Sequence, residues 1–371
     1  MGDNNKPMSV GGQAILEGVM MRSPNSMAVV CRKGDGQIVL KEQQWISLWN
    51  RLKFLRWPFM RGTVVLIEAM WNGISALTFS ANLFSEEEDK KAAAEAEEKG
   101  EAPKKAADKK ETKPLTSWAI TATIFVSMLF AIGLFVVVPH YATIAVGWLV
   151  GHELTVDMVL FHAVDGVIKI AIFLAYVWGI SFMPDIRRVF EYHGAEHKTI
   201  FAFDDGKELT LENVRPYTTF HPRCGTSFII IVLLASILLF SLAFPLLPKF
   251  AGLPKLARNF VFILIKLPLL LPIAGVSYEL IKLAGKYRRN PLLKLAVLPG
   301  LLTQRITTRP PSDDMLEVAI LSLKKCLWRE QKVREGVATE ESEITYPDFA
   351  TAAAELGTPE FHFTGGSCDV Q

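Results

Sequence analysis

Long apolar runs dominate the hydrophobic pattern of this chain. A helix of about 20 apolar residues is long enough to cross the hydrocarbon core of a bilayer. Four runs reach that length and predict four transmembrane helices, which would form a bundle within 115–285. The predicted fold class is therefore a mostly α membrane protein. The runs cover 118–138, 159–183, 227–247 and 260–283.

A further apolar run, at 64–83, has a polar side. Glu68 and Asn72 interrupt it one helical turn apart. This pattern predicts an amphipathic helix over 61–84 that lies at the membrane interface or packs on the bundle. A fifth span is the alternative, and the sequence alone does not decide whether this segment crosses the membrane.

The region before these helices, residues 8–60, is predicted to form a small β-rich head. A β-branched run at 27–33 is followed by a glycine-containing turn signal at 34–36. The segment 37–40 would then return as the second strand of a hairpin. The glycine pair at 11–12 indicates a close approach of backbone or unusual dihedral angles.

Three further segments lie outside the predicted bundle. Residues 85–114 are mostly Glu, Lys and Ala, which predicts a charged linker or an exposed helical insertion. Residues 286–330 are predicted as a cytoplasmic segment in which Ser312 begins an amphipathic helix over 312–328. Residues 331–371 are polar and are predicted to be disordered.

Composition supports the membrane class and excludes others. Hydrophobic residues make up 50% of the 371, and the mean hydropathy is positive. The net charge is +2, and no basic run with interleaved aromatics is present, so nucleic acid is not expected as a partner. The first residues have no hydrophobic core, so no signal peptide is expected. The four cysteines are far apart, which argues against a disulfide framework; they are Cys31, Cys224, Cys326 and Cys368.

The distribution of Lys and Arg predicts the orientation. Loop 139–157 has neither residue, whereas loop 184–225, the region after 283 and the N-terminal region have several each. Because basic loops stay in the cytoplasm, we expect a multi-pass protein with both termini cytoplasmic. Three basic residues in the loop 248–259 weaken this pattern without reversing it.

The strongest candidate for chemistry is an H-x-x-E-H motif formed by His193, Glu196 and His197. On a helix the two histidines lie one turn apart on one face, where both can reach one metal ion. Glu196 could orient a water or take its proton. The alternative interpretation is a chance pattern of polar residues on a wet helix face.

Three later residues are candidates to complete the site. His221, just before the third span, is the first candidate for a third ligand, with Cys224 next and Glu279 as a carboxylate alternative. Against these stand structural roles: a helix-entry loop for the first two, and an interfacial acid for Glu279. A role of Cys224 as a nucleophile lacks a base nearby in the sequence.

Ionisable residues also occur inside the second predicted span. His162, Asp165 and Lys169 recur on one helical face. Such groups are costly in the membrane and seldom face lipid. We favour a structural Asp165–Lys169 ion pair inside the bundle over an ion or proton path.

Several ordered motifs resemble the YqhQ-like family of bacterial membrane proteins, a domain of unknown function with the label "predicted metal-dependent enzyme". The resemblance covers roughly residues 8–330 and implies a protein of the bacterial inner membrane. The chain departs from the family in its long charged insertion at 85–114 and in Pro310-Pro311, where an acidic residue before a single proline is expected. The matching segments are 11–14, 17–22, 192–198, 221–227, 274–279, 299–301 and 307–308.

The first functional hypothesis is a metal-dependent hydrolase that acts at the cytoplasmic membrane face. His193, His197 and a third ligand would hold a divalent metal, zinc by preference, with Glu196 as general base. Arg223 is predicted to stabilise a developing anion. Glu17 and Arg22 would complete the site or bind substrate.

The expected partners are the lipid bilayer and a substrate that is a membrane protein or a lipid-like molecule; a homo-oligomer stays open. The alternative hypothesis is a non-enzymatic membrane scaffold or assembly factor. In it the same residues form a structural knot or a structural metal site. A transporter is disfavoured because no repeat is visible in the sequence.

Overall fold

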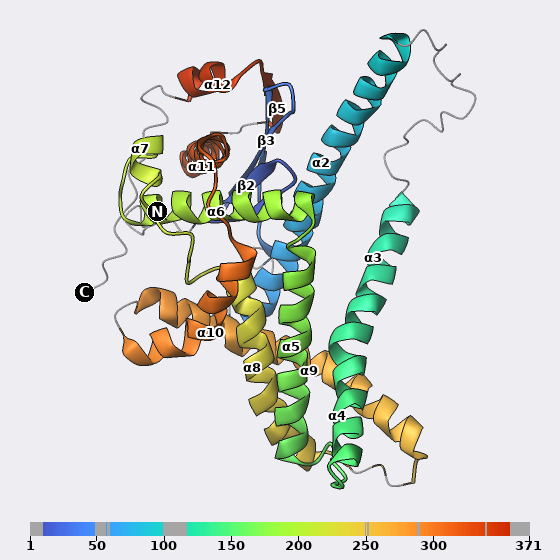
Figure 1. The fold of residues 1–371 in the computed structure, drawn as a ribbon. Helices are drawn as coiled ribbons and strands as arrows, with labels where there is room; N and C mark the ends of the chain where they lie inside the picture. Colours follow the sequence, from blue (N-terminus) through green and yellow to red (C-terminus); the bar gives the residue numbers. More distant parts are fainter. Residues whose placement is uncertain are drawn as a thin grey trace.

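The computed structural model describes residues 10–48, 57, 60–98, 117–248, 250, 252–287, 290–337 and 340–356. These residues form an antiparallel sheet with its covering helices, and a group of long apolar helices (Figure 1). Helix α6 runs between the two groups, nearly perpendicular to α5 (Figure 1). The predicted class, a mostly helical membrane protein with a small N-terminal sheet, is confirmed.

The sheet has five antiparallel strands in the order β1-β2-β3-β4-β5. The expected hairpin is formed by β3 and β4, where Gly36 in the turn has a φ of 91°. The fifth strand of the sheet comes from the far end of the described chain and pairs with β4, so that Ile344 lies opposite Leu40. The strands are β1 Gly11–Ile15, β2 Gly18–Arg22, β3 Ser26–Arg32, β4 Ile38–Gln44 and β5 Ser342–Tyr346.

The prediction of a disordered tail is wrong for residues 342–356. These residues form β5 and helix α12 (Phe349–Glu355), and Tyr346 and Leu356 are buried in the core. A short, mostly polar strand is recognisable only through its partner, because β4 supplies the hydrogen bonds and the apolar surface. Residues 357–371 lie outside the described residues.

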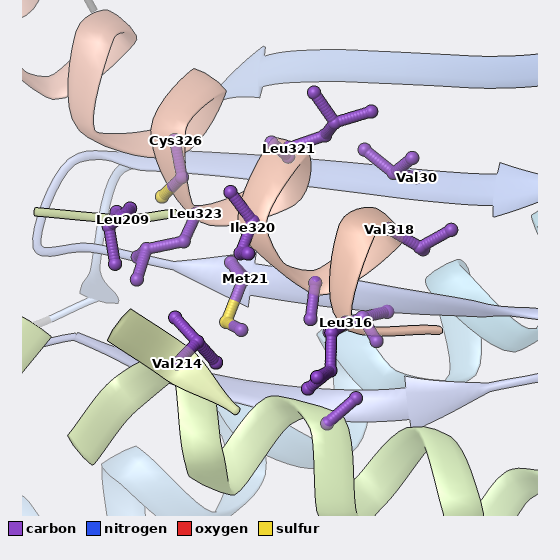
Figure 2. Packing of buried hydrophobic residues seen from close by; sticks show 14 of the residues in the cluster. Met21, Val30, Leu209, Val214, Leu316, Val318, Ile320, Leu321, Leu323 and Cys326 are labelled. Carbon is purple, nitrogen blue, oxygen red and sulfur yellow. The ribbon is translucent and has the colours of Figure 1, made fainter. Parts of the chain in front are cut away.

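Alternating residues of the sheet pack on helices at both faces. On β3, Ala28 and Val30 point toward helix α11 (Asp313–Arg334), whereas Val29 and Cys31 point toward helix α2 (Met60–Glu98). This period of two is the side-chain alternation of a strand. Figure 2 shows the first of these cores, in which Met21 and Val30 lie against side chains of α11.

Helix α11 is more deeply buried than the predicted amphipathic helix. It begins after Ser312, as expected, but extends to Arg334, with the sheet against one side and α6 and α7 (Leu211–Val214) against another. Its buried Glu330 accepts hydrogen bonds from Ser23 Oγ and the main-chain N–H of Asn25, each at 2.8 Å. These bonds fix the helix to the turn between β2 and β3.

The described residues contain five helical stretches long and apolar enough to cross a membrane, rather than about four. The additional one is the first half of α2. Its polar residues Glu68 and Asn72 are only 2% exposed, and Glu68 accepts hydrogen bonds from Ser47 Oγ at 2.6 Å and Leu48 N–H at 2.7 Å. The polar side of α2 therefore faces protein. The stretches are Met60–Ser85, Phe125–Leu149, Val159–Ile180, Gly225–Leu246 and Lys255–Gly285.

The first predicted span is shifted along the chain. It was expected to end at residue 138, but a π-helical turn precedes Pro139 and the helix continues to Leu149. A proline lacks a main-chain donor and is tolerated in the first turn after such an irregularity. The helices are α3 Ser117–Ile132, the π turn Gly133–Val137, α4 Val138–Leu149, α5 Val159–Ile180, α8 Gly225–Ala243 with a 3-10 turn at Phe244–Leu246, and α9 Lys255–Lys286.

A buried cluster of charged residues joins three of these helices. The predicted pair is present, with Lys169 Nζ 2.5 Å from Asp165 Oδ2. Lys266 of α9 also donates to that oxygen, at 3.3 Å, and lies 3.2 Å from His140 Nδ1 of α4. We call His140, Asp165, Lys169 and Lys266 the intramembrane cluster; each is at most 5% exposed.

Candidate metal centre

Helix α6 (Pro184–Asp204) carries the H-x-x-E-H motif. It begins four residues after α5 ends, with Pro184 in its first turn, where a proline needs no main-chain donor. His193 and His197 lie one turn apart on the same face, with ring centroids 4.4 Å apart. The motif therefore sits on a helix at the end of the apolar bundle, as its place after the second predicted span implied.

Both imidazoles have the same hydrogen-bonding arrangement. The Nδ1 atom of His193 lies 2.8 Å from the main-chain oxygen of Thr307, and Nδ1 of His197 contacts the main-chain oxygen of Thr219. Because a carbonyl oxygen only accepts, each Nδ1 carries a hydrogen, and in the neutral form of each ring Nε2 keeps the lone pair. This tautomer is the one that metal-binding histidines use when the second nitrogen is fixed by a carbonyl.

Cys224 completes a cluster of three ligand atoms. Its Sγ lies 3.2 Å from His193 Nε2, and the ligand atoms of His193, His197 and Cys224 all lie within 4.8 Å of one another. The Nε2 atom of His197 is buried and has no hydrogen-bond partner in the part of the chain that the structure describes. A metal ion between these three atoms would satisfy that nitrogen. We call these three residues the metal centre, as the candidate site for an ion.

The electrostatics of the metal centre stabilise a thiolate on Cys224. Burial opposes charge on Cys224, but the two imidazoles outweigh it and hold the pKa of the thiol well below its usual range. Burial also lowers the pKa of His193, yet the adjacent thiolate raises that pKa to about 9. Cys224 is in addition the N-cap residue of α8, and a helix N-terminus stabilises a thiolate. The thiolate is thus the negative charge that a divalent ion would meet.

Glu196 lies beside the metal centre without belonging to the three-ligand cluster. Its side chain passes Gly12 of β1, where an added Cβ would be 2.9 Å from Glu196 Cγ. Burial raises the pKa of Glu196 above its usual range, against the opposing effect of the two imidazoles and the Gly12 N–H. The close approach predicted for the glycine pair is therefore confirmed at Gly12, where a side chain would displace the carboxylate.

The segments around Thr219 and Thr307 hold the two carbonyl oxygens that accept from the imidazoles. Arg309 N–H donates to the Phe190 carbonyl at 2.9 Å, so the segment after Thr307 runs along α6. At Gly194 an added Cβ would collide with the carbonyl oxygen of Arg309 and lie 3.2 Å from Thr219 Cγ2. Only a glycine at this position lets both loops approach the helix this closely.

His221, the first candidate for a third ligand, is held next to the metal centre rather than in it. Its Nε2 lies 3.6 Å from Asp204 Oδ2, and its Nδ1 accepts from the Arg223 N–H at 3.3 Å. Burial lowers the pKa of His221 to about 4 although Asp204 acts against it, so the ring is neutral. Arg223 also pairs with Asp204, at 2.6 Å, and so supports the loop beside the site.

The other predicted residues have partners elsewhere. Glu279 forms an ion pair with Arg61 of α2, which accounts for its carboxylate without a metal. Glu17, with a φ of 48°, forms an ion pair with Arg188 of α6 and thereby ties the β1–β2 turn to the motif helix. Arg22 faces Glu68, at 3.9 Å, and lies over the ring of Trp45. None of these three belongs to the three-ligand cluster.

Sequence reasoning missed the groups that orient the imidazoles. They are the main-chain carbonyls of Thr219 and Thr307, and a carbonyl leaves no signal in residue type. Thr307 did fall in one of the motifs of the family resemblance. Asp204, which supports His221 and Arg223, carried no such signal.

The comparisons with known proteins identify relatives without a described activity. A family described as "Protein of unknown function (DUF1385)" matches residues 57–329. The chain is 30% identical over 337 residues to "Uncharacterized protein YqhQ" of Bacillus subtilis (strain 168), which covers 88% of this chain and 95% of the relative. No solved structure matches.

Proposed function

Because the chain belongs to this family of proteins of unknown function (DUF1385), whose descriptions name no activity, we propose a function from the geometry: a membrane-bound, zinc-dependent hydrolase. One observation carries the proposal. His193 and His197 both donate Nδ1–H to main-chain carbonyls, which turns their Nε2 lone pairs toward the thiol of Cys224. This arrangement prepares three ligands for one ion.

The ligand set favours zinc. Two imidazole nitrogens and a thiolate are the donor types of zinc sites, and three protein ligands with one open position are the pattern of catalytic rather than structural zinc. Zinc held there would supply Lewis-acid chemistry. His221, the first candidate for a third ligand, would then support the site by packing against His197. The ring centroids of the two histidines are 5.6 Å apart.

Glu196 is the proposed general base. Its carboxylate is buried next to both imidazoles, and its raised pKa brings proton uptake closer to neutral pH. The N–H of Gly12 donates to the Glu196 carboxylate, so β1 fixes the position of that carboxylate. Glu196 would take a proton from the attacking water and later return it to the leaving group.

The location of the protein is proposed from its apolar helices and its basic loops. Five helices suit a multi-pass membrane protein, and the bacterial relative supports a bacterial membrane. The Lys and Arg of loop 184–225 support a position of α6 on the cytoplasmic side of the inner membrane. The proposed substrate is a lipid-like molecule or a membrane-protein segment that reaches this side.

Elemental analysis of the detergent-purified full chain, prepared without chelators, tests the metal. We expect about one zinc per chain in the wild type, none in His193→Ala/His197→Ala, and unchanged zinc in Glu196→Gln. His152→Ala is the matched control because His152 is exposed in the loop before α5, and it should keep the metal. Wild-type protein without metal above background would overturn the proposal.

The hydrolytic step needs a second experiment. Bacterial membrane vesicles are incubated with zinc-loaded wild type or zinc-loaded Glu196→Gln, and lipids and new peptide N-termini are profiled by mass spectrometry. Products that accumulate with the wild type alone support hydrolysis with Glu196 as base. Identical profiles would overturn the hydrolase while leaving the metal site in place, as the alternative of a structural metal site requires.

A thiol enzyme is the second candidate, favoured by one contact. His193 Nε2 lies 3.2 Å from Cys224 Sγ, the geometry of a nucleophile and its base. The sequence showed no base near Cys224, but the fold supplies one from α6. Iodoacetamide distinguishes the two candidates: rapid alkylation of Cys224 in protein as isolated supports the thiol enzyme, whereas protection that a chelator removes supports the metal.

A further inference from the structure

Helix α10 (Pro291–Thr307) has one apolar face that no described part of the chain covers. Leu295, Leu298 and Leu302 are 66%, 43% and 47% exposed, and their spacing puts them on one side of the helix. Leu292, one turn earlier, is 75% exposed. The opposite side of α10 is buried and includes Val297, Gly300, Gln304 and Thr307.

The buried side places α10 at the level where α8 begins. An added Cβ at Gly300 would lie 2.7 Å from Cβ of Ser227, and Gln304 Nε2 donates to Ser227 Oγ at 2.7 Å. Ser227 belongs to the first turn of the apolar stretch Gly225–Leu246. Helix α10 contacts α8 and lies beside the end of α8 that is nearer to α6 (Figure 1), where we expect the hydrocarbon layer to end on the side of the sheet.

The composition of α10 fits a lipid surface. Lys294 and Arg305 are exposed and lie on one flank of the leucine row, where basic side chains reach lipid phosphates. The helix has 17 residues and is therefore about 25 Å long. An apolar face flanked by basic residues on a helix of this kind is typical of helices that lie in the membrane interface.

We propose that α10 is an interfacial helix whose leucine row is embedded in the lipid of the leaflet nearest the sheet. Helix α8, on which α10 packs, also exposes apolar side chains beyond its first turn, where Leu238 is 69% and Leu242 70% exposed. Exposed apolar side chains on both of these packed helices favour lipid as the occupant over a protein partner, since a membrane-spanning α8 already meets the bilayer.

Lipid contact of α10 has a consequence for the metal centre. The last turn of α10 supplies the Thr307 carbonyl that accepts from His193 Nδ1. The same helix thus contacts lipid with one side and orients a metal ligand with its end. The inference about lipid does not depend on the proposed hydrolase, because it rests on exposure, spacing and the contact with α8.

Cysteine protection in nanodiscs tests the proposal. Leu295→Cys and Leu298→Cys are made in a Cys368→Ser background, in which the remaining Cys31, Cys224 and Cys326 are buried. Each variant, with one chain per disc, is treated with a water-soluble maleimide. Two control variants give the reference rates of modification. Leu238→Cys on α8 represents a thiol in lipid, and Thr345→Cys, exposed on β5, represents a thiol in water.

We expect both α10 variants to be modified at least about tenfold more slowly than Thr345→Cys and at a rate near that of Leu238→Cys. All four variants should react fully in sodium dodecyl sulfate, which shows that each thiol is competent. Reaction of Leu295→Cys at the rate of Thr345→Cys in intact discs would overturn the proposal. Zinc measured on the same samples reports on the metal centre separately, so the two proposals can fail independently.

Discussion

Two buried clusters of ionisable residues in this molecule differ in how their charges and lone pairs are arranged. The intramembrane cluster contains a carboxylate between two ammonium groups, with Asp165 Oδ2 2.5 Å from Lys169 Nζ and 3.3 Å from Lys266 Nζ. The metal centre contains a thiol and two imidazoles, whose ligand atoms converge within 4.8 Å. The first cluster uses its one carboxylate to bind both ammonium groups, whereas the second leaves lone pairs facing one point.

Burial of ionisable residues therefore does not by itself indicate a binding site. In the intramembrane cluster each lysine already has the Asp165 carboxylate as a hydrogen-bond acceptor. In the metal centre the carbonyls of Thr219 and Thr307 occupy the Nδ1 atoms and leave Nε2 of His197 without a partner among the described residues. What distinguishes a ligand set is the direction in which its unused lone pairs point.

The largest effect is expected from Asp165→Asn. Removing the charge leaves two buried ammonium groups without their carboxylate, and breaking a buried ion pair typically costs about 3–5 kcal/mol. The free energy of unfolding in detergent should fall by that amount, with metal content unchanged. Glu153→Gln is the control, because the Glu153–Lys255 pair is exposed, and its thermal midpoint should not move. Equal shifts in both variants would contradict the structural role of Asp165.

Cys224→Ser should have the next largest effect, this time on metal affinity. Loss of a thiolate ligand should weaken zinc binding more than about 100-fold, beyond the 10–100-fold typical of outer-shell changes. Competition with a chromogenic chelator measures the affinity. Cys326→Ser is the matched control, because Cys326 is equally buried but contacts Ser26 in the core of the sheet. Comparable losses of zinc affinity in both variants would exclude Cys224 as a ligand.

Gly194→Ala should have an intermediate effect on zinc affinity, because it disturbs the two segments that pack on α6 at Thr219 and Arg309. The new Cβ would meet the Arg309 carbonyl and displace the Thr307 carbonyl that orients His193. Zinc affinity should fall about 10–100-fold, as for other losses of outer-shell support. Gly179→Ala on α5 is the control, since nothing lies within 4 Å of its added Cβ. Unchanged affinity in Gly194→Ala would mean that the two carbonyls do not orient the ligands.

The smallest effect is expected from Lys169→Met. Asp165 keeps Lys266 at 3.3 Å, so the remaining pair is neutral. Replacing a buried charge by an apolar side chain of similar length is often neutral when the remaining charges balance. We expect a change within about 1 kcal/mol in the free energy of unfolding, from the same denaturation assay. A loss as large as that of Asp165→Asn would show that both lysines are needed.

Features with a local signature could be predicted from the sequence, and features made by distant partners could not. The H-x-x-E-H spacing predicted a helix with both histidines on one face, and the spacing of Asp165 and Lys169 predicted their pair. Lys266 and His140 come from other helices, so only the fold reveals that they join this pair.

The same limit applied to the candidate for a third ligand. His221 and Cys224 are three residues apart in one loop, and the sequence ranked the histidine first. The fold turns His221 toward Asp204 and brings Cys224 to His193. The choice between them depends on the path of the loop, which is set by contacts of Gln304 with His221 and Ser227 across 77 or more positions in the chain.

The sharing of one sheet by both ends of the described chain fixes the parity of the membrane crossings. Elements that share a core lie on one side of a bilayer, so the chain between β4 and α11 crosses an even number of times. Helix α6 also packs on β1 and α11, and three of the five apolar helices lie between β4 and α6. An even number of crossings requires that at least one of those three does not cross. Ala76, Phe79 and Leu83 of α2 pack on the sheet, so we expect α2 to stay on the side of the sheet and the other four helices to cross.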